Sequence, residues 1–256
     1  MIDERAIIDP SAKIASNVTI GPWTVIGPEV EIGEDSWIGP HVIIKSHTKI
    51  GKNNRIYQYS SIGEDPQHMA YHGEQTWMEI GDNNIIREFC TLHRGTPQGK
   101  KVTRLGNNNF IMSYVHIAHD CAVGNHTIFV NNASIAGHVM VDDYVVIGGF
   151  SGVHQFCYVG AHSFITRATM VPKDVLPYVL VSGNPATVHG LNAVGLKRRG
   201  FAEETIRMLR QAYKLIYRQG LTVKNALPQL EALLPSCPEV QLLINGLTES
   251  NRGIVR

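Results

Sequence analysis

The sequence is poor in the features that mark several large classes of protein. Its 256 residues contain 23 lysines and arginines against 22 aspartates and glutamates, and this net charge of +1 provides no strong field for nucleic acid. No apolar run approaches the roughly 18 residues that a membrane-spanning helix needs. The first residues, Met1–Arg5, lack the apolar segment of a secretory signal. We therefore expect a soluble cytoplasmic protein that has no membrane span and no nucleic-acid partner.

Cysteine is also scarce, and its four residues are widely separated in the chain: Cys90, Cys121, Cys157 and Cys237. No two of them form a C-x-x-C pair, and none shows the spacing of metal ligands. Reduced thiols in a cytosolic protein are therefore the expected state. The sequence predicts neither a bound metal nor a cofactor.

What the sequence does contain is an apolar residue at every sixth position. One series runs without a gap over residues 8–62, a second over 80–92 and a third over 105–171, and glycine often follows the apolar residue. A helix would show a period near 3.6 residues and a simple strand a period of 2. A period of six with glycine at the corners is typical of a hexapeptide β-helix. Three hexads make one triangular turn, so residues 18 apart are expected to stack.

The repeat ends after Val171, and a helical period begins about 25 residues later. Pro228 and Pro235 are expected to break this second part into short helices. We therefore predict a mainly β fold in two domains. Residues 1–189 form a parallel β-helix, and residues 190–256 form a small α-helical C-terminal domain.

Two insertions interrupt the hexads, at residues 63–79 and 93–104, and counting the faces in threes places both at one edge of the prism. Long loops on a rigid scaffold usually carry function. The 18-residue register aligns four histidines along the same edge, His93, His119, His138 and His154, and His116 lies just before His119 on the same turn. Histidine suits proton transfer near neutral pH because its unperturbed pKa is about 6.5. One such residue would indicate only a hydrogen-bonded corner, but the aligned set predicts an active site.

Several segments resemble the UDP-N-acetylglucosamine O-acyltransferase family of lipid A synthesis. They are Leu92–Thr96, His116–Cys121, Ala136–His138, Val153–Cys157 and Gly195–Phe201. The similarity extends over nearly the whole chain. It implies a left-handed coil, a homotrimer, and transfer of a 3-hydroxyacyl group from acyl carrier protein to the 3-position of a UDP-sugar acceptor, as the first step of lipid A synthesis.

The resemblance also implies roles for individual residues. It makes His119 the general base, with Asp120 orienting it, and it gives the backbone N–H of Gly137 to the oxyanion of the tetrahedral intermediate. The positions that match substrate-binding residues are His93, His116, His138, His154, Gln155, Asn192, Arg198 and Arg199. Arginine suits the last two because its planar group pairs with phosphate oxygens. Without the resemblance, these arginines would be interpreted as the solvated start of a basic helix.

Two positions depart from the family pattern. Where the family usually has an aspartate and a lysine, this chain has His68 and Ala70. A carboxylate favours the charged and inert form of an amine, whereas a neutral imidazole does not. We therefore expect His68 to bind the acceptor, which can be UDP-N-acetylglucosamine or its 3-amino analogue. Near the end of the acyl groove, Arg167 replaces a smaller residue, and we expect it to shorten the acyl chain or to turn away from the groove.

Other proteins with this repeat remain as alternatives. A zinc-dependent carbonic anhydrase of the same coil type needs three histidines at about 2.1 Å from one ion. A hexapeptide acyltransferase that uses coenzyme A would differ in its donor. The N-acyltransferase that acts later in the same pathway usually has an extra N-terminal domain, whereas the hexads here begin at Ile8. A scaffold or ice-binding coil would show flat threonine arrays without clustered histidines.

Overall fold

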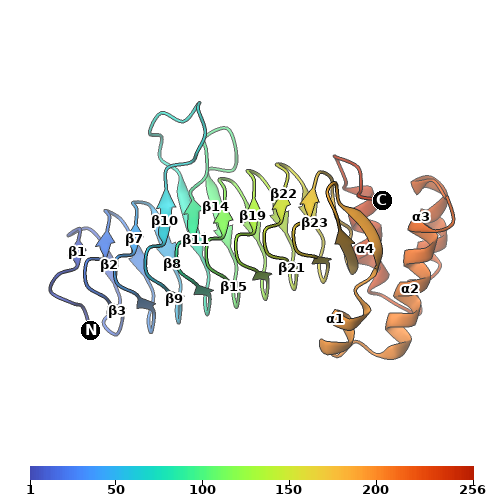
Figure 1. Ribbon diagram of the computed structural model, residues 1–256, viewed down its shortest axis with the longest axis horizontal. Helices are drawn as coiled ribbons and strands as arrows, with labels where there is room; N and C mark the ends of the chain where they lie inside the picture. Colours follow the sequence, from blue (N-terminus) through green and yellow to red (C-terminus); the bar gives the residue numbers. More distant parts are fainter.

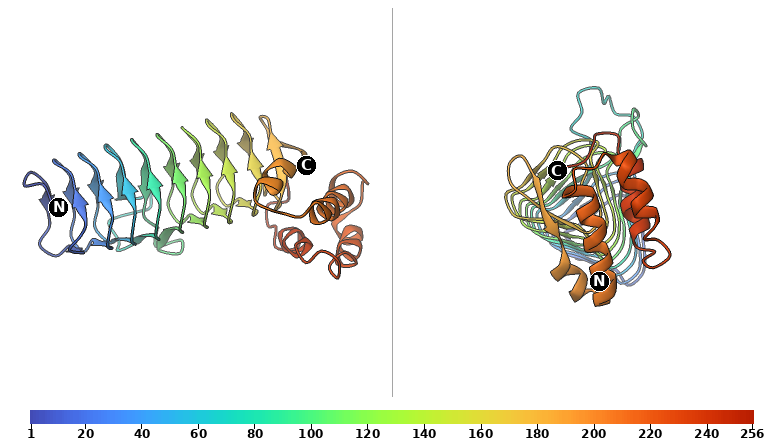
Figure 2. Two further views of the ribbon diagram at one scale, coloured as in Figure 1. Left: turned by 90° about the horizontal axis from the view of Figure 1, so that it is seen from below. Right: turned by 90° about the vertical axis from the view of Figure 1, so that its right-hand side faces the viewer.

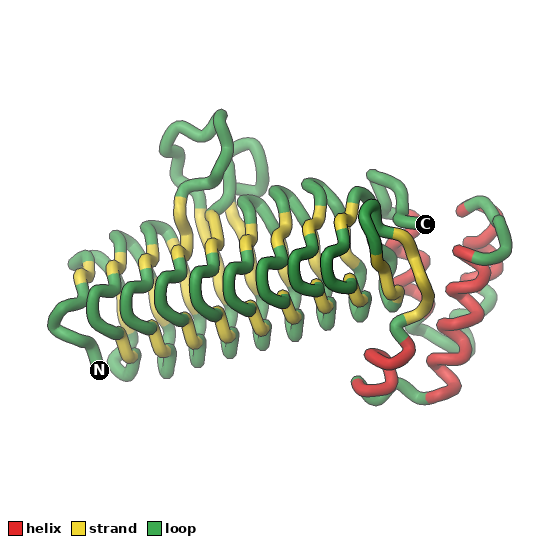
Figure 3. Tube along the Cα trace, in the orientation of Figure 1, coloured by secondary structure: helices red, strands yellow, loops and turns green.

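Each hexad forms one short strand and one corner, and the chain winds through them into a long triangular coil (Figure 1). The computed structural model describes all 256 residues and confirms the predicted left-handed parallel β-helix with a helical C-terminal part. The end-on view in Figure 2 shows the triangular outline, and Figure 3 shows the strands alternating with the corners.

The strands form three sheets, which we call faces A, B and C. Face A contains β3 (Thr19–Ile20), β6 (Trp37–Ile38), β9 (Arg55–Ile56), β12 (Ile85–Ile86), β15 (Phe110–Ile111), β18 (Ile128–Phe129), β21 (Val146–Ile147), β24 (Phe164–Ile165), β26 (Val179–Ser182) and β27 (Thr187–Leu191). Face B contains β1 (Ile7–Ile8), β4 (Val25–Ile26), β7 (Ile43–Ile44), β10 (Ser61–Glu64), β13 (Thr91–His93), β16 (His116–Ile117), β19 (Ser134–Ile135), β22 (Gly152–Val153) and β25 (Met170–Val171). Face C contains β2 (Lys13–Ile14), β5 (Glu31–Ile32), β8 (Thr48–Ile50), β11 (Trp77–Ile80), β14 (Val102–Leu105), β17 (Ala122–Val123), β20 (Met140–Val141) and β23 (Tyr158–Val159).

The apolar residue of each hexad points into the coil and stacks on its counterpart one turn away. On face B, Ile117 pairs with Ile135 and Ile135 pairs with Val153, so residues 18 apart are neighbours, as predicted. All three side chains are at most 3% exposed. Burying one such side chain contributes roughly 1.5–3 kcal/mol, and the single core of 41 buried residues runs the length of the coil.

Glycine at the corners provides space for the next turn. A Cβ atom on Gly33 would lie 2.7 Å from the carbonyl carbon of Gly51, which is one turn away. The left-handed backbone that each corner requires is adopted by other residues, such as His126 and Tyr144, with φ of 56° and 60°. The glycines of the repeat are therefore needed for the close contact between turns.

A ladder of buried polar side chains supports the corner between faces C and A. The Asn84 amide donates to the side-chain oxygen of Asn54 at 3.0 Å and to the carbonyl of Gly106 at 2.9 Å, and its own oxygen accepts the N–H of Asn109 at 2.9 Å. Asn84 is fully buried. Each side chain in the ladder therefore satisfies backbone groups of the turns above and below it.

Both insertions leave the coil at the edge between faces B and C, as predicted, and project together from it (Figure 1). The insertions are shorter than the gaps in the hexad pattern suggest. The flanking strands β10, β11, β13 and β14 extend into these gaps and pair there with neighbouring turns. The loops that remain span residues 65–76 and 94–101. After each loop the register resumes, with Ile62 paired to Leu92 and Leu92 to Ile117.

The C-terminal part begins with the antiparallel hairpin of β26 and β27, so the predicted boundary at residue 190 falls inside a strand. Four helices follow and pack around a second cluster of 14 buried residues: α1 (Ala193–Arg198), α2 (Glu203–Tyr217), α3 (Val223–Glu231) and α4 (Val240–Thr248). The prediction that Pro228 breaks a helix was wrong, because Pro228 lies inside α3. It is the sixth of the nine residues of α3, and its missing N–H removes one backbone hydrogen bond from this short helix. None of the helices has the length and apolar character needed to cross a membrane.

The polar ladder yields a test of the fold. We expect Asn84→Ala to lower the free energy of unfolding by roughly 3 kcal/mol, because it leaves several buried donors and acceptors without partners. Asn131→Ala is the matched control, since this asparagine is exposed, and it should change stability by less than about 0.5 kcal/mol. Chemical denaturation followed by circular dichroism measures both variants. Equal stability of the two would show that the ladder contributes nothing.

Candidate active site

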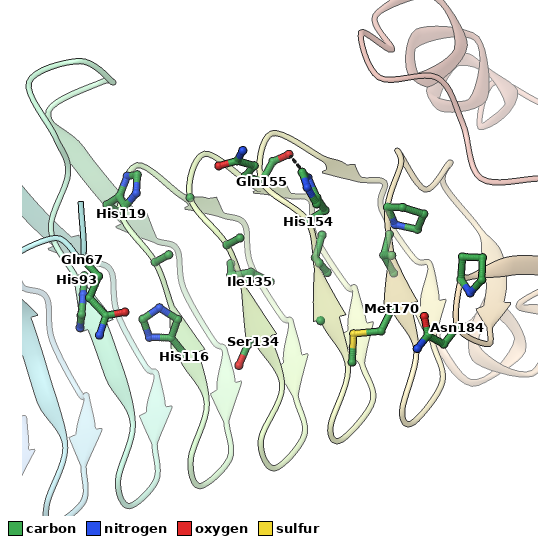
Figure 4. A pocket seen from close by; sticks show the side chains of 18 residues that line it. Gln67, His93, His116, His119, Ser134, Ile135, His154, Gln155, Met170 and Asn184 are labelled. Carbon is green, nitrogen blue, oxygen red and sulfur yellow. Dashed lines mark hydrogen bonds between the residues drawn. The ribbon is translucent and has the colours of Figure 1, made fainter. Parts of the chain in front are cut away.

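A groove of about 630 Å³ runs over face B from the two loops toward the C-terminal hairpin (Figure 4). The end beside the loops is polar and is lined by Gln67, His93, His116 and His119. The other end is apolar and is lined by Val153, Met170, Val171, Pro172 and Pro185. A groove with one polar and one apolar end fits a ligand that combines a polar head with a hydrocarbon chain.

His119 and Asp120 form a hydrogen-bonded pair at the edge between faces B and C. Nδ1 of His119 lies 2.9 Å from Oδ2 of Asp120. The Asp120 carboxylate is fully buried, and the His119 side chain is 12% exposed. Because a carboxylate only accepts, Nδ1 carries the proton and Nε2 is left as the basic nitrogen. This pair has the arrangement of a general base with its orienting acid.

The second loop, residues 94–101, encloses the Asp120 carboxylate. The Thr96 hydroxyl donates to Oδ2 at 2.6 Å, and the backbone N–H groups of Thr96 and Lys100 donate to Oδ1 at 3.1 and 3.0 Å. Burial alone would raise the pKa of Asp120, but the hydrogen bonds from His119 and Thr96 outweigh it and hold the pKa below its usual value. Asp120 therefore stays ionised and fixes both the loop and the imidazole.

Gly137 faces the His119 ring from the next turn of the coil. A Cβ atom at this position would lie 2.6 Å from Cε1 and 2.8 Å from Nε2 of His119, so only glycine fits. The Gly137 N–H donates to no acceptor in the chain. The basic nitrogen and a free backbone donor therefore stand beside each other, as a base and an oxyanion donor must.

His68 and His138 each contact the ring of His119. The His68 ring, carried by the first loop, lies 5.2 Å from the His119 ring edge to face, and the His138 ring lies 5.1 Å away in the same kind of contact. Burial is the main cause that lowers the pKa of His138. A neutral His138 adds no positive charge that would oppose proton uptake by His119.

The first loop is attached to the coil by Arg94, a buried residue on the second loop. Its guanidinium donates to the Gly63 carbonyl at 2.8 Å and to the Tyr71 hydroxyl at 2.9 Å, and it forms an ion pair with Asp65. Arg94 is 7% exposed. The position of His68 over the dyad therefore depends on contacts between the two loops.

His93 and His116 line the polar end of the groove as a second histidine pair. Their rings lie 5.0 Å apart, edge to face, and Nδ1 of His116 is 2.7 Å from the hydroxyl of Thr91. Burial, followed by the neighbouring His116, lowers the pKa of His93 to about 4. Nδ1 of His93 is buried without a hydrogen-bond partner. Such a group indicates a missing polar contact from a ligand.

His154 and Gln155 line the groove farther from the loops and are exposed. Nδ1 of His154 lies 3.1 Å from the Gln155 carbonyl (Figure 4), and its Nε2 has no hydrogen-bond partner in the chain. Arg167 is exposed at the edge between faces A and B and does not line the groove. Its role in acyl length stays a prediction.

Asn192, Arg198 and Arg199 lie on a different edge from the dyad. The Arg199 guanidinium lies over the Tyr144 ring and 3.5 Å from Nδ1 of His162, and Tyr144 and His162 are corners between faces C and A. Asn192 caps α1 and donates to the His162 carbonyl at 2.9 Å. None of the three predicted residues lines the groove. Within one chain, they are separated from His119 by the width of face C.

His119, Asp120 and His138 also place possible metal-ligand atoms within 4.8 Å of one another. However, both Asp120 oxygens already accept hydrogen bonds from the protein, including a 2.6 Å bond from Thr96. His138 Nε2 lies 3.8 Å from Asp120 Oδ2, whereas His119 Nδ1 lies 2.9 Å from it. This arrangement fits a base-orienting carboxylate better than it fits a ligand of a cation.

The sequence did not identify Thr96, Lys100 and Met170 as site residues. Thr96 belongs to a segment that carries the resemblance, but only its contact with Asp120 gives it a role. Lys100 acts through its backbone N–H, which no side-chain pattern reveals. Met170 stands at a hexad position like any other, and only the groove lining distinguishes it.

Comparisons with known proteins agree over the full length of the chain. Residues 174–255 match the family model described as UDP-N-acetylglucosamine O-acyltransferase, domain 2, and residues 29–62 and 103–137 match the bacterial transferase hexapeptide model. The acyl-[acyl-carrier-protein]–UDP-N-acetylglucosamine O-acyltransferase of Pseudomonas fluorescens strain SBW25 is 58% identical, covering 100% of this chain and 99% of that one.

Solved structures show the same similarity. LpxA from Acinetobacter baumannii has 52% sequence identity and a TM-score of 0.97, and the match covers 100% of this chain and 99% of that one. The UDP-N-acetylglucosamine O-acyltransferase from Moraxella catarrhalis has 49% identity and a TM-score of 0.97 with the same coverage.

The buried His93 predicts how stability depends on pH. Its pKa is about 4 in the folded chain against an ordinary 6.5, so between these values only the unfolded chain binds the proton. The free energy of unfolding should therefore fall as the pH is lowered from about 6.5 toward 4. His93→Gln should reduce this slope, as measured by urea denaturation at several pH values. An identical slope in the variant would contradict the assignment.

Proposed function

Because the chain belongs to the UDP-N-acetylglucosamine O-acyltransferase family, we propose that it transfers a 3-hydroxyacyl group from acyl carrier protein to the 3-position of UDP-N-acetylglucosamine. The chain is an acyltransferase of the first step of lipid A synthesis. The observation that carries the assignment of its chemistry is the His119–Asp120 pair, whose free nitrogen lies beside Gly137, a residue with an unpaired backbone N–H.

The proposed reaction begins with proton transfer to His119. Nε2 takes the proton of the acceptor's 3-hydroxyl while that oxygen attacks the thioester carbonyl carbon. The new carbon–oxygen bond places negative charge on the former carbonyl oxygen, which accepts the N–H of Gly137. The carbon–sulfur bond then breaks, the carbonyl forms again, and the imidazolium returns its proton to the leaving thiolate. Asp120 stabilises the imidazolium between these steps.

The two ends of the groove suit the two parts of the product. We assign the sugar to the polar end beside His93 and His116, and the hydrocarbon to the apolar end beside Val153 and Val171. His138, His154 and Gln155 lie between these ends or beside the dyad, within reach of the sugar and the diphosphate. The donor we propose is an acyl carrier protein, which the names of the relatives specify for those proteins.

We further propose that the enzyme works as a homotrimer in the cytoplasm. The separation of Arg199 from His119 supports the trimer, because a second copy can bring its edge between faces C and A against the groove. Arg198, Arg199 and Asn192 of that copy would then hold the nucleotide phosphates. Four free and buried cysteines agree with a reducing compartment.

His68 bears on which acceptor is used. Its ring contacts the proposed base at 5.2 Å, and its Nδ1 is buried without a partner. A carboxylate in this place would favour the ammonium form of a 3-amino sugar, which cannot attack, whereas an imidazole allows the neutral amine. We therefore propose that the 3-amino analogue is an acceptor beside the 3-hydroxyl sugar.

His119 is the first residue to test. His119→Ala should lower the turnover number by about 10²–10⁴-fold, because the base is removed while the buried Asp120 pocket persists. Steady-state assays with an acyl-carrier-protein donor measure the loss, and circular dichroism verifies the fold. His41→Ala, an exposed corner between faces A and B near the N-terminal end of the coil, is the matched control and should remain within about threefold of wild type. Turnover of a folded His119→Ala enzyme within tenfold of wild type would exclude His119 as the base.

The acceptor is tested by direct competition. The enzyme is given one acyl donor and equal amounts of UDP-N-acetylglucosamine and its 3-amino analogue, and mass spectrometry measures the ester and amide products. We expect amide to form, and we expect His68→Asp to shift the product ratio toward ester. A tenfold or greater preference of wild type for the 3-hydroxyl sugar would refute the amine proposal without affecting the acyltransferase assignment.

A further inference from the structure

The first loop, residues 65–76, carries two side chains of the site but has little regular structure of its own. Gln67 lines the polar end of the groove, and the His68 ring lies 5.2 Å from the His119 ring. The backbone N–H groups of His68 and Tyr71 donate only to carbonyls within the loop, at 2.7 and 3.0 Å. The placement of Gln67 and His68 therefore depends on contacts with other segments of the chain.

Arg94 supplies these contacts, and it binds the first loop on both sides of the two site residues. Its Nη2 forms the ion pair with Asp65, which precedes them, and donates at 2.9 Å to the hydroxyl of Tyr71, which follows them. Its Nη1 donates to the Gly63 carbonyl in β10 at 2.8 Å. The guanidinium also lies 5.8 Å from the centroid of the Tyr71 ring. One guanidinium therefore holds both ends of the segment 65–71.

The other polar contact between the two loops is weak. The Gln98 amide donates to the Ala70 carbonyl at 3.4 Å, and this bond is exposed to solvent. Arg94 is only 7% exposed. Hydrogen bonds from a charged group are stronger than those between neutral groups, so Arg94 is the main polar attachment of the first loop.

The backbone on both sides of the Arg94 side chain is itself fixed. The Arg94 N–H donates to the Glu64 carbonyl at 3.1 Å, and the Gly95 N–H donates to the Trp77 carbonyl at 3.2 Å. A Cβ atom on Gly95 would lie 2.2 Å from the backbone nitrogen of Val102, so the two chain segments are in close contact there. The guanidinium therefore projects from a backbone that the neighbouring strands hold in place.

We propose that Arg94 is a positioning residue for the acceptor: it holds the segment 65–71 so that Gln67 and His68 meet the UDP-sugar. This inference rests on the proposed function. Arg94 does not line the groove, so it acts through the loop. A loop released from Arg94 gains conformational freedom, and the acceptor must then order it on binding. The hydrocarbon of the donor binds at the other end of the groove and keeps its contacts.

The experiment separates the two substrates in steady-state kinetics of the whole enzyme. UDP-N-acetylglucosamine is varied at a saturating acyl-carrier-protein donor, and the donor is then varied at saturating UDP-sugar. We expect the KM of the UDP-sugar to rise about tenfold in Arg94→Lys and about threefold in Tyr71→Phe, because a lysine cannot bind all three acceptors and phenylalanine removes one of them. The KM of the donor should stay within about twofold of wild type.

Asp65→Asn provides a variant that folds even if the buried Arg94→Lys does not, since the Asp65 side chain is 56% exposed. It should raise the KM of the UDP-sugar about tenfold by removing the ion pair. Asp3→Asn is the matched control, because Asp3 pairs with Arg5 at 2.9 Å at the N-terminal end of the coil. It should leave both KM values unchanged. Circular dichroism verifies the fold of each variant.

A second arm tests whether Arg94 acts through the loop. In an enzyme that already carries Gln67→Ala and His68→Ala, adding Asp65→Asn or Arg94→Lys should change the KM of the UDP-sugar by less than about twofold, because the side chains that Arg94 positions are gone. A defect of folding alone would instead lower the active fraction, and with it the apparent kcat, while both KM values stayed at the wild-type level.

A KM of the UDP-sugar within twofold of wild type in folded Asp65→Asn and Tyr71→Phe would overturn the inference. An equal rise in the KM of both substrates would overturn it as well, as would a full tenfold rise in the enzyme that lacks the Gln67 and His68 side chains. If wild type transfers no acyl group to the UDP-sugar, the proposed function itself fails. Active wild type with an unchanged KM of the UDP-sugar in the variants rejects only the role of Arg94.

Discussion

The vertical register between successive turns is the constraint on which the rest of the structure depends. Most strands are two residues long, too short to be stable alone, and gain stability only by pairing with the turns above and below. The chain can therefore leave the coil only where it rejoins the same register, as Ile62, Leu92 and Ile117 show. Both insertions satisfy this condition at the edge between faces B and C. The two loops therefore lie side by side at the edge that carries His119.

The Asp120 carboxylate joins the fold to the proposed chemistry. It accepts the Thr96 hydroxyl and the Lys100 N–H, which shape the second loop, and it also accepts Nδ1–H of His119. Removing this charge would release the loop and the imidazole together. The close contact of Gly137 with the same ring restricts the other side of the imidazole.

The periodic features could be predicted from the sequence, because each hexad repeats the same physical requirement. The faces, the shared edge of the insertions and the alignment of His119 with Gly137 all follow from counting in eighteens. Contacts that depend on irregular backbone could not be predicted, such as the Lys100 N–H on Asp120. The prediction that Pro228 breaks a helix was wrong, because the effect of a proline depends on its position in the helix, and Pro228 is accommodated inside α3. The resemblance predicts Arg199 as a binding residue, and only the structure shows that it lies on a different edge from His119.

We propose that the active site combines the His119 edge of one subunit with the Arg199 edge of another, and mixed trimers test this most directly. His119→Ala and Arg199→Ala subunits carrying different tags are co-expressed, and trimers bearing both tags are purified and assayed. In a closed ring of head-to-tail contacts, each trimer that bears both tags has both residues at one of its three sites, so activity should rise to about a third of wild type. His119→Ala mixed with Asp120→Ala, both on one edge, should stay inactive. Mixed trimers of the first kind that are no more active than either parent would contradict the account.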